Sequence, residues 1–440
     1  MIELYRWNPV YNFVFSVKNQ FIKRFGNVEY KEYELNGKTI TCLEYWIETL
    51  DRADYREKIK YLELNQKENF LLVRYAKYSD VLSGEEEVTL DDIWNMYDGF
   101  YLECRSIVLD LQREEIVILP FKKFRNLNEC EENMLENVRE EINSAKNVEI
   151  SNKLDGSMQC ARYYHGKIFM SGSQAVDPQK SWRLEDGYRM LKENKNYCEM
   201  IQFFPSTTFI FEYISLADAH VVKYSKEEEG LYLVGMRDSL TGKQYSYKAV
   251  LAVARRYDVK CTQAFDKTLE DVLEEIKTIK SEDQEGFVLN IIHEDDSARL
   301  IKIKGDDYVH IHKILSKLSS INLIIRAIAD ECVDDLRSKV PAAYKSRVDI
   351  LEKIARDFVT KQERIVNEYY YNAPKSDKKT FMIWVEKNVP REYKPYVRNC
   401  WLGIKNNYLK SHTETNNPRY IKLVEMGVKR EDYTTIFSEE

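Results

Sequence analysis

The chain has 440 residues, of which 44% are hydrophobic and 32% are charged, and its formal net charge is −7. This composition is typical of a soluble globular protein with two or three domains. No stretch approaches the roughly 18 consecutive apolar residues that a membrane span needs, and the N-terminal residues lack the pattern of an export signal. We therefore expect a cytoplasmic protein with no membrane partner.

The first hundred residues have a mixed pattern. Segments 27–34 and 70–78 are rich in residues that favour strands, and the pair Asn36-Gly37 is typical of a hairpin turn.

Between residues 101 and 304, short segments that favour strands alternate with segments that favour helices. The expected strands are 102–109, 116–119, 148–153, 158–164, 167–170, 208–214, 231–236, 286–292 and 300–303. The expected helices are 131–145, 181–203, 246–257 and 268–279. Many strands with scattered helices predict an α+β domain built on antiparallel sheet.

The last part of the chain has a different pattern. Apolar residues recur at helical spacing from Ile311 to Ile328 and again from Val348 to Phe358, which predicts an all-α C-terminal domain. From His310 onward, 24 Lys and Arg residues face 18 Asp and Glu residues, so this part carries +6 and the preceding part carries −13. A polyanion is expected to bind the basic part.

A candidate catalytic motif lies at 153–157, where the sequence reads Lys-Leu-Asp-Gly-Ser. Downstream, Glu212 lies in an apolar strand and Glu285 precedes another. Lys302 and Lys304 follow in a third strand, where a period of two places both side chains on one face. Two ammonium groups on one face repel each other unless an anion lies between them, and a phosphate is the natural occupant.

These residue types suggest a mechanism. We expect the charges of Lys302 and Lys304 to lower the pKa of Lys153, so that Lys153 attacks an α-phosphate as a neutral amine. Glu285 offers a hard oxygen ligand of the kind that holds Mg²⁺ against substrate phosphates.

The ordered set of Lys-x-Asp-Gly-Ser, Phe-Glu-Tyr, Glu-Gly-Phe and Lys-Ile-Lys resembles motifs I, III, IV and V of the covalent nucleotidyltransferases. This superfamily comprises ATP-dependent DNA ligases, RNA ligases and mRNA-capping enzymes. Four flanking segments are similar to the RNA ligase 1 family, typified by the T-even phage enzyme that reseals broken tRNA, and they lie at 75–80, 102–107, 123–129 and 302–309.

The resemblance covers roughly residues 70–312 and implies an adenylyltransferase domain at 1–309, with an N-terminal portion at 1–100 and the motif core at 101–309. The helical domain at 310–440 lies outside the resemblance, and its +6 balance predicts that it selects RNA. The resemblance implies ATP and Mg²⁺ as cofactors, with Mn²⁺ as an alternative metal. Lys153 would be the adenylylated nucleophile, and Arg105, Lys123, Asp155 and Gly156 would bind ATP and its phosphates. Glu212 would contact the ribose side of the nucleotide and Glu285 would bind the metal. Lys302 and Lys304 would bind the α-phosphate, and Tyr308 would stack near the adenine.

By the same resemblance, the chain is expected to be an ATP-dependent RNA ligase. It would join RNA 5′-phosphate and 3′-hydroxyl ends through a lysyl-AMP and an adenylylated RNA, in RNA or tRNA repair. Nicked tRNA is the expected substrate, an end-healing kinase-phosphatase is an expected partner, and the host would be a bacterium or a phage-infected cell. Two departures bear on the substrate geometry, because Ser171 stands where the family has a lysine and Arg125 stands where it has an aromatic residue.

Alternatives stay open at this point. A DNA ligase or a guanylyltransferase shares the motifs but appends a β-barrel where this chain turns helical. A catalytically silent RNA-binding protein on the same fold would fit the missing cation at Ser171. Residue by residue, Lys302 and Lys304 fit the exposed face of an edge strand, Glu212 fits a carboxylate paired with an arginine, and Tyr308 fits core packing.

Overall fold

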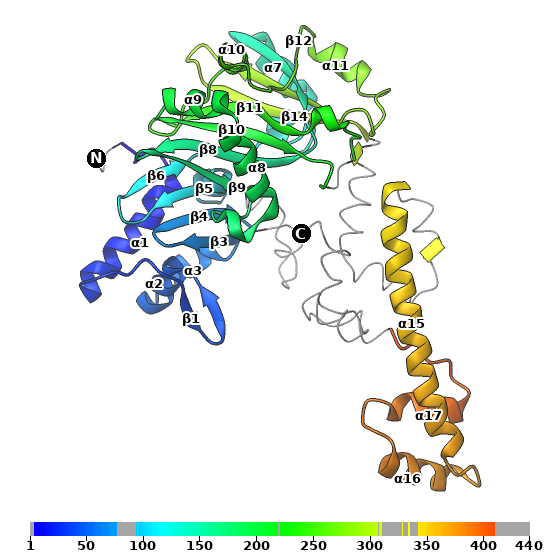
Figure 1. Ribbon diagram of the computed structural model, residues 1–440. Helices are drawn as coiled ribbons and strands as arrows, with labels where there is room; N and C mark the ends of the chain where they lie inside the picture. The colour runs from blue at the N-terminus through cyan, green and yellow to red at the C-terminus, as the bar shows by residue number, and fades with distance from the viewer. Residues whose placement is uncertain are drawn as a thin grey trace. The chain divides into compact units, whose positions relative to one another are not determined.

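The computed structural model describes residues 4–76, 94, 96–218, 221–306, 308–309, 328, 333–334 and 342–409 (Figure 1). The chain divides into two compact units, Met1–Asp306 and Asp307–Glu440. No helix in these described ranges is long and apolar enough to cross a membrane. The roles predicted for 1–309 and 310–440 remain predictions.

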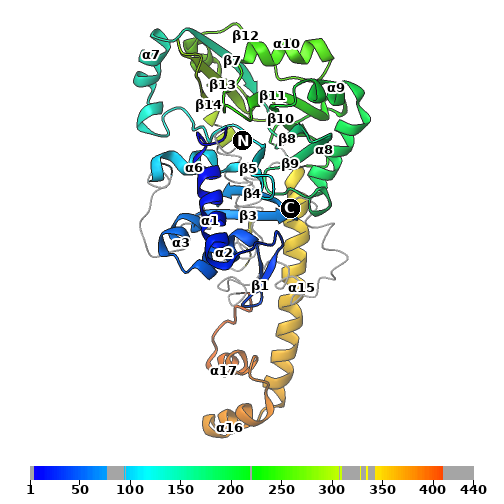
Figure 2. The same cartoon turned by 90° about the vertical axis from the view of Figure 1, so that its left-hand side faces the viewer.

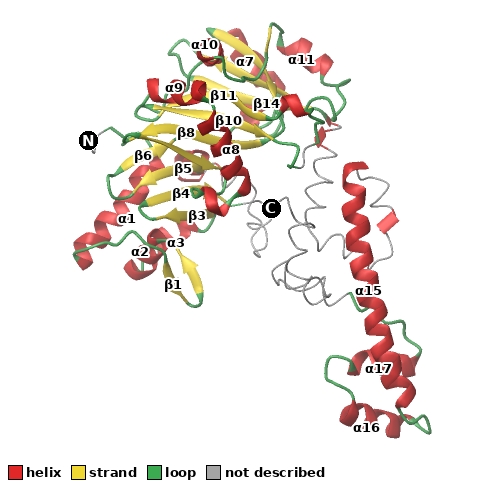
Figure 3. Ribbon diagram, in the orientation of Figure 1, coloured by secondary structure: helices red, strands yellow, loops and turns green. Residues whose placement is uncertain are grey.

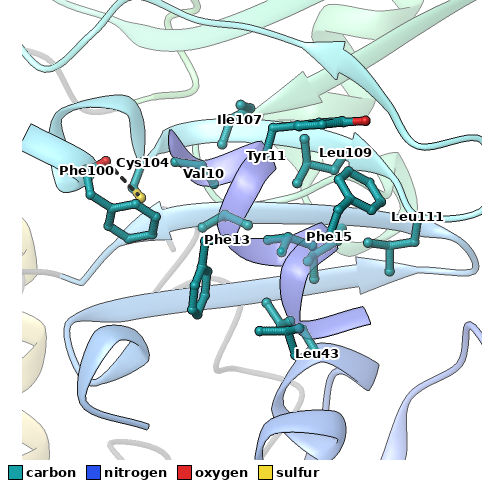
Figure 4. Packing of buried hydrophobic residues seen from close by; sticks show 14 of the residues in the cluster. Val10, Tyr11, Phe13, Phe15, Leu43, Phe100, Cys104, Ile107, Leu109 and Leu111 are labelled. Atoms are coloured by element: carbon teal, nitrogen blue, oxygen red, sulfur yellow. Dashed lines mark hydrogen bonds between the residues drawn. The ribbon is translucent and has the colours of Figure 1, made fainter. Parts of the chain in front are cut away.

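The first unit begins with helices that the sequence patterns did not predict. Helix α1 (Pro9–Phe25) starts at the cap Asn8, whose side chain accepts hydrogen bonds from the amides of Val10 and Tyr11. Helices α2 (Cys42–Leu50) and α3 (Ala53–Ile59) follow. Figure 4 shows side chains of α1 and α2 packed against the strand that ends near Leu111. The cap followed by a proline at the first helical position was the signal that could have predicted α1.

The predicted turn at Asn36-Gly37 is confirmed. It joins the short strands β1 (Tyr33–Leu35) and β2 (Lys38–Ile40), which pair antiparallel. The predicted strand at 27–34 is wrong over most of its length, since only its last two residues are in β1.

An antiparallel sheet of order β3-β4-β5-β6 packs against these helices (Figure 2). Its strands are β3 (Leu62–Lys67), β4 (Phe70–Tyr75), β5 (Arg105–Asp110) and β6 (Glu115–Ile118). The one-turn helices η1 (Met96–Gly99) and α6 (Phe100–Glu103) precede β5, so the predicted strand at 102–109 begins later than expected.

A second antiparallel sheet has the order β11-β10-β8-β9. Its strands are β8 (Ser157–Tyr164), β9 (Lys167–Gly172), β10 (Thr207–Ile214) and β11 (Gly230–Asp238). One face packs on the first sheet through residues such as Val108, Cys160 and Ile210. The other face is covered by α8 (Trp182–Glu193), α9 (Lys195–Phe203) and α10 (Tyr247–Tyr257). The single helix predicted at 181–203 is two helices, because Asn194 leaves helical geometry and caps α9.

The third sheet has the order β12-β7-β13-β14 and is also antiparallel (Figure 2). Figure 3 shows strands in yellow and helices in red. Its strands are β7 (Asn147–Lys153), β12 (Ala264–Phe265), β13 (Gly286–Ile292) and β14 (Ala298–Lys304). Helices α7 (Leu135–Asn143) and α11 (Leu269–Glu275) cover one face, where they enclose Ile150, Phe287 and Ile301. Side chains alternate along a strand, so Lys153, Lys302 and Lys304 point from the opposite face. The remaining short 3-10 turns are η2 (Glu131–Asn133), η3 (Pro178–Lys180) and η4 (Lys226–Glu228).

In the second unit, the described elements are all helical. They are α15 (Ala342–Asn372), α16 (Lys378–Asn388) and α17 (Lys394–Leu402), and their core includes Leu351, Phe381 and Val397. The predicted helical segment at 348–358 is confirmed within α15, whereas the segment at 311–327 lies outside the described residues. An α+β first unit on antiparallel sheets followed by C-terminal helices confirms the predicted fold class.

Candidate active site

Lys153, Gly286 and Lys304 form one row across three adjacent strands. Gly286 in β13 is the register partner of Lys153 in β7 and of Lys304 in β14. Its φ of +150° is a conformation that residues with a side chain rarely adopt, and a Cβ at this position would lie 2.1 Å from the carbonyl oxygen of Ile303. The glycine therefore lets β13 lie close to the backbone of β14 beside Lys304.

Glu285 joins the two ends of this row. One carboxylate oxygen, Oε2, accepts a hydrogen bond from Nζ of Lys153 at 2.6 Å, and the other, Oε1, lies 2.8 Å from Nζ of Lys304. The Glu285 side chain is only 3% exposed. A buried carboxylate shared by two ammonium groups is a strongly coupled cluster, and removal of one member leaves an uncompensated charge.

The pKa values in this cluster follow from burial and charge. Burial pushes the pKa of Glu285 upward, but Lys153 and Lys304 outweigh it, and the pKa is lowered. For Lys153, burial works to lower the pKa, yet the negative charges of Glu285, Glu212 and Asp155 raise it. The expected lowering of the Lys153 pKa is therefore wrong for the arrangement in this structure, because carboxylates act on the amine more strongly than the other lysines do.

The lysine with a strongly lowered pKa is Lys302. Burial is the largest cause, and the positive charges of Arg105, Lys123, Lys153 and Lys304 add to it. Lys302 therefore lies among four other cationic side chains. A cluster of cations of this kind fits the phosphate site that the spacing of Lys302 and Lys304 predicts, and that role remains a prediction.

Phe124 lies between two of these cations. The guanidinium carbon of Arg105 is 4.8 Å from the centre of the Phe124 ring, and Nζ of Lys302 is 4.7 Å from it. Cation–π attraction holds both groups without neutralising their charge. The nearby ammonium group of Lys123 lies 5.0 Å from the ring centre of Tyr75 and 5.3 Å from that of Trp94. Aromatic rings thus lie beside three of the cations in this cluster.

Strand β14 is not a free edge at Lys302. The amide of Lys302 donates to the carbonyl of Arg125 at 3.0 Å, and the carbonyl of Lys302 accepts from the amide of Leu127 at 2.8 Å. Asn126 and Lys302 form a short parallel bridge at this point. Strand β14 is the last strand of its sheet, but Lys302 and Lys304 are half-buried, so the interpretation of these lysines as the exposed face of an edge strand is right about the strand and wrong about the exposure.

Glu212 faces the cluster from β10. Desolvation raises its pKa to about 7, with Lys153 and Arg105 lowering it and Glu285 raising it. Arg105 and Lys153 both lower the pKa of this carboxyl. The ribose-binding role of Glu212 remains a prediction.

The Asp155-Gly156 pair shapes the loop after Lys153. The Asp155 carboxylate accepts hydrogen bonds from the amides of Val221 and Val222 at 2.7 and 3.2 Å. A Cβ on Gly156 would lie 2.5 Å from the carbonyl oxygen of Tyr213. Both residues fix the backbone here, and their role in ATP binding remains a prediction.

A network around Ser157 was missed by the sequence interpretation. The Ser157 hydroxyl donates to Asp218 at 3.1 Å, and Arg183 makes two bonds of 2.6 Å to the same carboxylate. The hydroxyl that ends the Lys-x-Asp-Gly-Ser motif was a signal of this network in the sequence, but nothing in the spacing pointed to Asp218 or Arg183.

Ser171 is 1% exposed in β9, and Tyr308, at 2% exposure, belongs to the second unit. The adenine-binding role of Tyr308 remains a prediction.

Whether a metal ion fits this site depends on the protein ligands that surround Glu285. Among the described residues, no group of three or more His, Cys, Asp or Glu side chains could hold an ion. Glu285 fits an ion that takes one or two protein carboxylates and completes its shell with phosphate and water, which is the habit of Mg²⁺. Both Glu285 oxygens are held by lysines here, so such an ion requires Lys153 or Lys304 to move.

The comparisons with known proteins point to one family. Residues 103–316 match the RNA ligase family, and this range includes Lys153, Glu285 and Lys302. A protein of Thermovibrio ammonificans described as an RNA ligase is 26% identical over 307 residues, covering 67% of this chain and 77% of that protein.

A second relative is a protein of the Autographa californica nuclear polyhedrosis virus described as a bifunctional polynucleotide kinase and RNA ligase. It is 24% identical over 287 residues, covering 62% of this chain and 38% of that protein. Among solved structures, an archaeal ATP-dependent RNA ligase aligns with a TM-score of 0.41 at 12% identity, covering 82% of this chain and 99% of that chain. The family match confirms the resemblance that the motifs predict.

Proposed function

We propose that this chain, whose residues 103–316 match the RNA ligase family, is an ATP-dependent RNA ligase that joins 5′-phosphate and 3′-hydroxyl ends. The observation that carries the proposal is the position of Lys153, 2.6 Å from the buried carboxylate of Glu285 and beside a cluster of cations around Lys302. A nucleophilic amine next to an anion site is what nucleotide transfer onto a lysine needs.

In the first step, Nζ of Lys153 forms a P–N bond to the α-phosphorus of ATP, and the bond from that phosphorus to the bridging oxygen breaks to release pyrophosphate. Lys302, Lys304, Arg105 and Lys123 would bind the phosphate oxygens and stabilise the charge that develops there. The amine must lose its proton before it attacks.

Release of Glu285 from Lys153 supplies a route to the neutral amine. Glu285 would hold Mg²⁺, or Mn²⁺ as an alternative, and such an ion supplies charge neutralisation on the phosphates. With Glu285 turned away, its negative charge no longer raises the pKa of Lys153, and burial still lowers it against the raising effect of Glu212 and Asp155. A lowered pKa of Lys153 in the loaded site is part of the proposal.

In the second step, a 5′-phosphate oxygen of RNA attacks the same phosphorus, the P–N bond breaks, and Lys153 regains its amine. In the third step, the 3′-hydroxyl oxygen of a second RNA end attacks the 5′-phosphate phosphorus and AMP leaves. One anion site serves all three steps, because each exchanges one substituent on phosphorus.

The biological setting is also part of the proposal. RNA or tRNA repair fits the resemblance to the RNA ligase 1 family, and nicked tRNA is the proposed substrate. The viral relative combines a polynucleotide kinase with a ligase in its name, which supports an end-healing kinase-phosphatase as a partner here. The second unit, with its +6 balance from His310 onward, would select the RNA.

Incubation with radiolabelled ATP or GTP and Mg²⁺, followed by a denaturing gel, tests the proposal. We expect label from ATP alone, and we expect unlabelled 5′-phosphorylated RNA to remove it from the protein. Absence of covalent label with both nucleotides would contradict the proposed chemistry, and label from GTP would favour a guanylyltransferase.

A further inference from the structure

A cavity of about 470 Å³ lies in the first unit at the start of β14. Three chain segments line much of it: 122–125, the turn at 241–244 after β11, and 295–300 at the start of β14. Its wall on β14 is formed in part by Ala298 and Leu300. These two positions alternate in step with Lys302 and Lys304, so they lie on the same face of the strand as the candidate phosphate ligands.

Phe124 connects the cavity to the reactive cluster. It lines the cavity, and its ring centre lies 4.8 Å from the Arg105 guanidinium and 4.7 Å from Nζ of Lys302. The cavity and the anion site therefore share a wall. A molecule bound in one of them would lie close to the other along β14.

The lining is cationic. Six Lys and Arg side chains and three carboxylates contribute to it. Arg237 is already paired within the protein, because both its terminal nitrogens donate hydrogen bonds to the buried carboxylate of Glu103. Arg299 is likewise paired with Glu141.

Lys122 and Lys243 differ from those two arginines. Their side chains are 63% and 59% exposed, and their ion pairs are long, at 3.4 Å to Glu103 and 3.8 Å to Asp296. Glu103 has Arg237 and Asp296 has Lys146 as closer partners, at 2.8 Å and 2.6 Å. Either ammonium group can therefore bind a new anion without leaving a carboxylate unpaired.

We propose that this cavity binds a nucleotide of the single-stranded RNA that adjoins the end being joined. Lys122 and Lys243 would bind its phosphates, and Leu102, Phe124 and Leu300 would give apolar contact to the sugar and base. Two cations from separate segments suit the spaced phosphates of a strand, whereas a free nucleotide carries its phosphates together at one end. This inference rests on the proposed function and adds a second RNA-binding surface outside the reacting cluster.

The test uses the full chain with Lys122→Glu, Lys243→Glu and the double variant. Lys195→Glu is the matched control, because Lys195 is 86% exposed on α9 and lines no part of the cavity. Fluorescence anisotropy would measure binding of a 5′-phosphorylated dinucleotide and of a longer single-stranded RNA over a salt series. Radiolabelled ATP would report lysine adenylylation in each protein.

We expect the double variant to bind the longer RNA about tenfold more weakly near 0.1 M salt, with the salt slope reduced by about 0.7 for each phosphate that is no longer neutralised. Binding of the dinucleotide, which includes the nucleotide next to the end, should weaken as well, whereas adenylylation should match that of the control variant. The neutral pair Lys122→Gln and Lys243→Gln should show the same weakening to a smaller degree, and it keeps the test valid if charge reversal disturbs the fold.

Equal affinity of the control and of both double variants for the longer RNA would overturn the inference. Loss of ATP binding with RNA binding retained would also overturn it, because the cavity would then hold a free nucleotide. Failure of the proposed function is a separate result, since it would appear as absence of lysine labelling in the unmodified chain.

Discussion

Nζ of Lys153 lies 2.6 Å from Oε2 of Glu285, although 132 residues separate the two in the sequence. The bond ties the candidate nucleophile to the candidate metal ligand. In this arrangement the pKa of Lys153 is raised, so the amine is held protonated. Under the proposed function, activation of Lys153 includes release of Glu285 to another cation.

The first prediction concerns the nucleophile. Lys153→Arg should abolish covalent labelling by ATP, because a guanidinium remains protonated and cannot attack phosphorus. A denaturing gel after incubation with radiolabelled ATP checks this. Lys195→Arg on α9 is the control and should label normally, and label retained in Lys153→Arg would place the nucleotide on another residue.

The second prediction concerns Glu285. Glu285→Gln should lower the rate of adenylylation by at least about tenfold, because the amide is a weaker ligand for a divalent cation. The rate of label incorporation over a range of Mg²⁺ and Mn²⁺ concentrations measures the effect. Glu270→Gln is the matched control, because Glu270 is 61% exposed and pairs with Arg139 at the surface. Equal rates in the two variants would remove Glu285 from the metal site.

The third prediction links activity to stability at Lys302. Because its pKa is lowered in the folded protein, the native state binds fewer protons at this residue than the unfolded state does between the lowered pKa and 10.5. Its contribution to stability is therefore unfavourable near neutral pH and improves as the pH rises through that window. Lys302→Met should raise the unfolding free energy by roughly 1 kcal/mol near neutral pH, the order expected for one stabilising substitution.

The same variant should lose adenylylation. Thermal unfolding at several pH values, with and without pyrophosphate, checks the effect on stability and on anion binding, and labelling by radiolabelled ATP checks the effect on activity. Pyrophosphate should raise the unfolding temperature of the unmodified chain more than that of Lys302→Met. A variant that is both less stable and fully active would show that Lys302 is not an anion ligand.

The fourth prediction concerns Glu212, whose pKa is raised to about 7, chiefly by desolvation. Between the ordinary value of 4.5 and about 7, the folded protein binds more protons at this carboxyl than the unfolded chain does. Its contribution to stability is thus fully present below pH 4.5 and is lost as the pH rises through about 7. Glu212→Gln should gain stability relative to the unmodified chain as the pH rises from about 5 to about 8. Parallel unfolding curves for the two proteins over this range would contradict the raised pKa.

The fifth prediction concerns the two units. A chain ending at Lys317 should keep lysine adenylylation and should seal structured RNA more weakly, with the missing part of the binding sensitive to salt. Gel assays of labelling and of sealing, on the same preparation, measure the two activities. Sealing of every tested RNA at the full rate would show that the second unit serves stability or assembly.

The sequence predicted those features of the candidate site that depend on the spacing of residues within a single strand. The spacing of Lys302 and Lys304 predicted a shared face, and both lysines do lie on the face that carries Lys153. It could not predict which charges lie nearest to Lys153, because those depend on the register of β13 between β7 and β14. For this reason the pKa of Lys153 was expected to be lowered, whereas in the structure it is raised.

The fold was predicted best from residue 101 onward, where turns separate short strands. Two local signals were overlooked. Asn8 followed by Pro9 marks the start of α1, and Asn194 ends one helix and caps the next. The pairing of segment 125–127 with β14 had no local signal, since a bridge of one residue leaves no periodicity to read.

The order of the third sheet has a consequence for synthesis of the chain. Strand β7 ends at Lys153, but its two neighbours are β12, at Ala264–Phe265, and β13, which begins at Gly286. During translation, at about 5–20 residues per second, both edges of β7 wait on the order of ten seconds for their partners. The nascent chain therefore carries the candidate nucleophile on a segment whose partners are not yet made. Glu149, Ser151 and Lys153, on one face of that segment, make it a poor template for association with other chains.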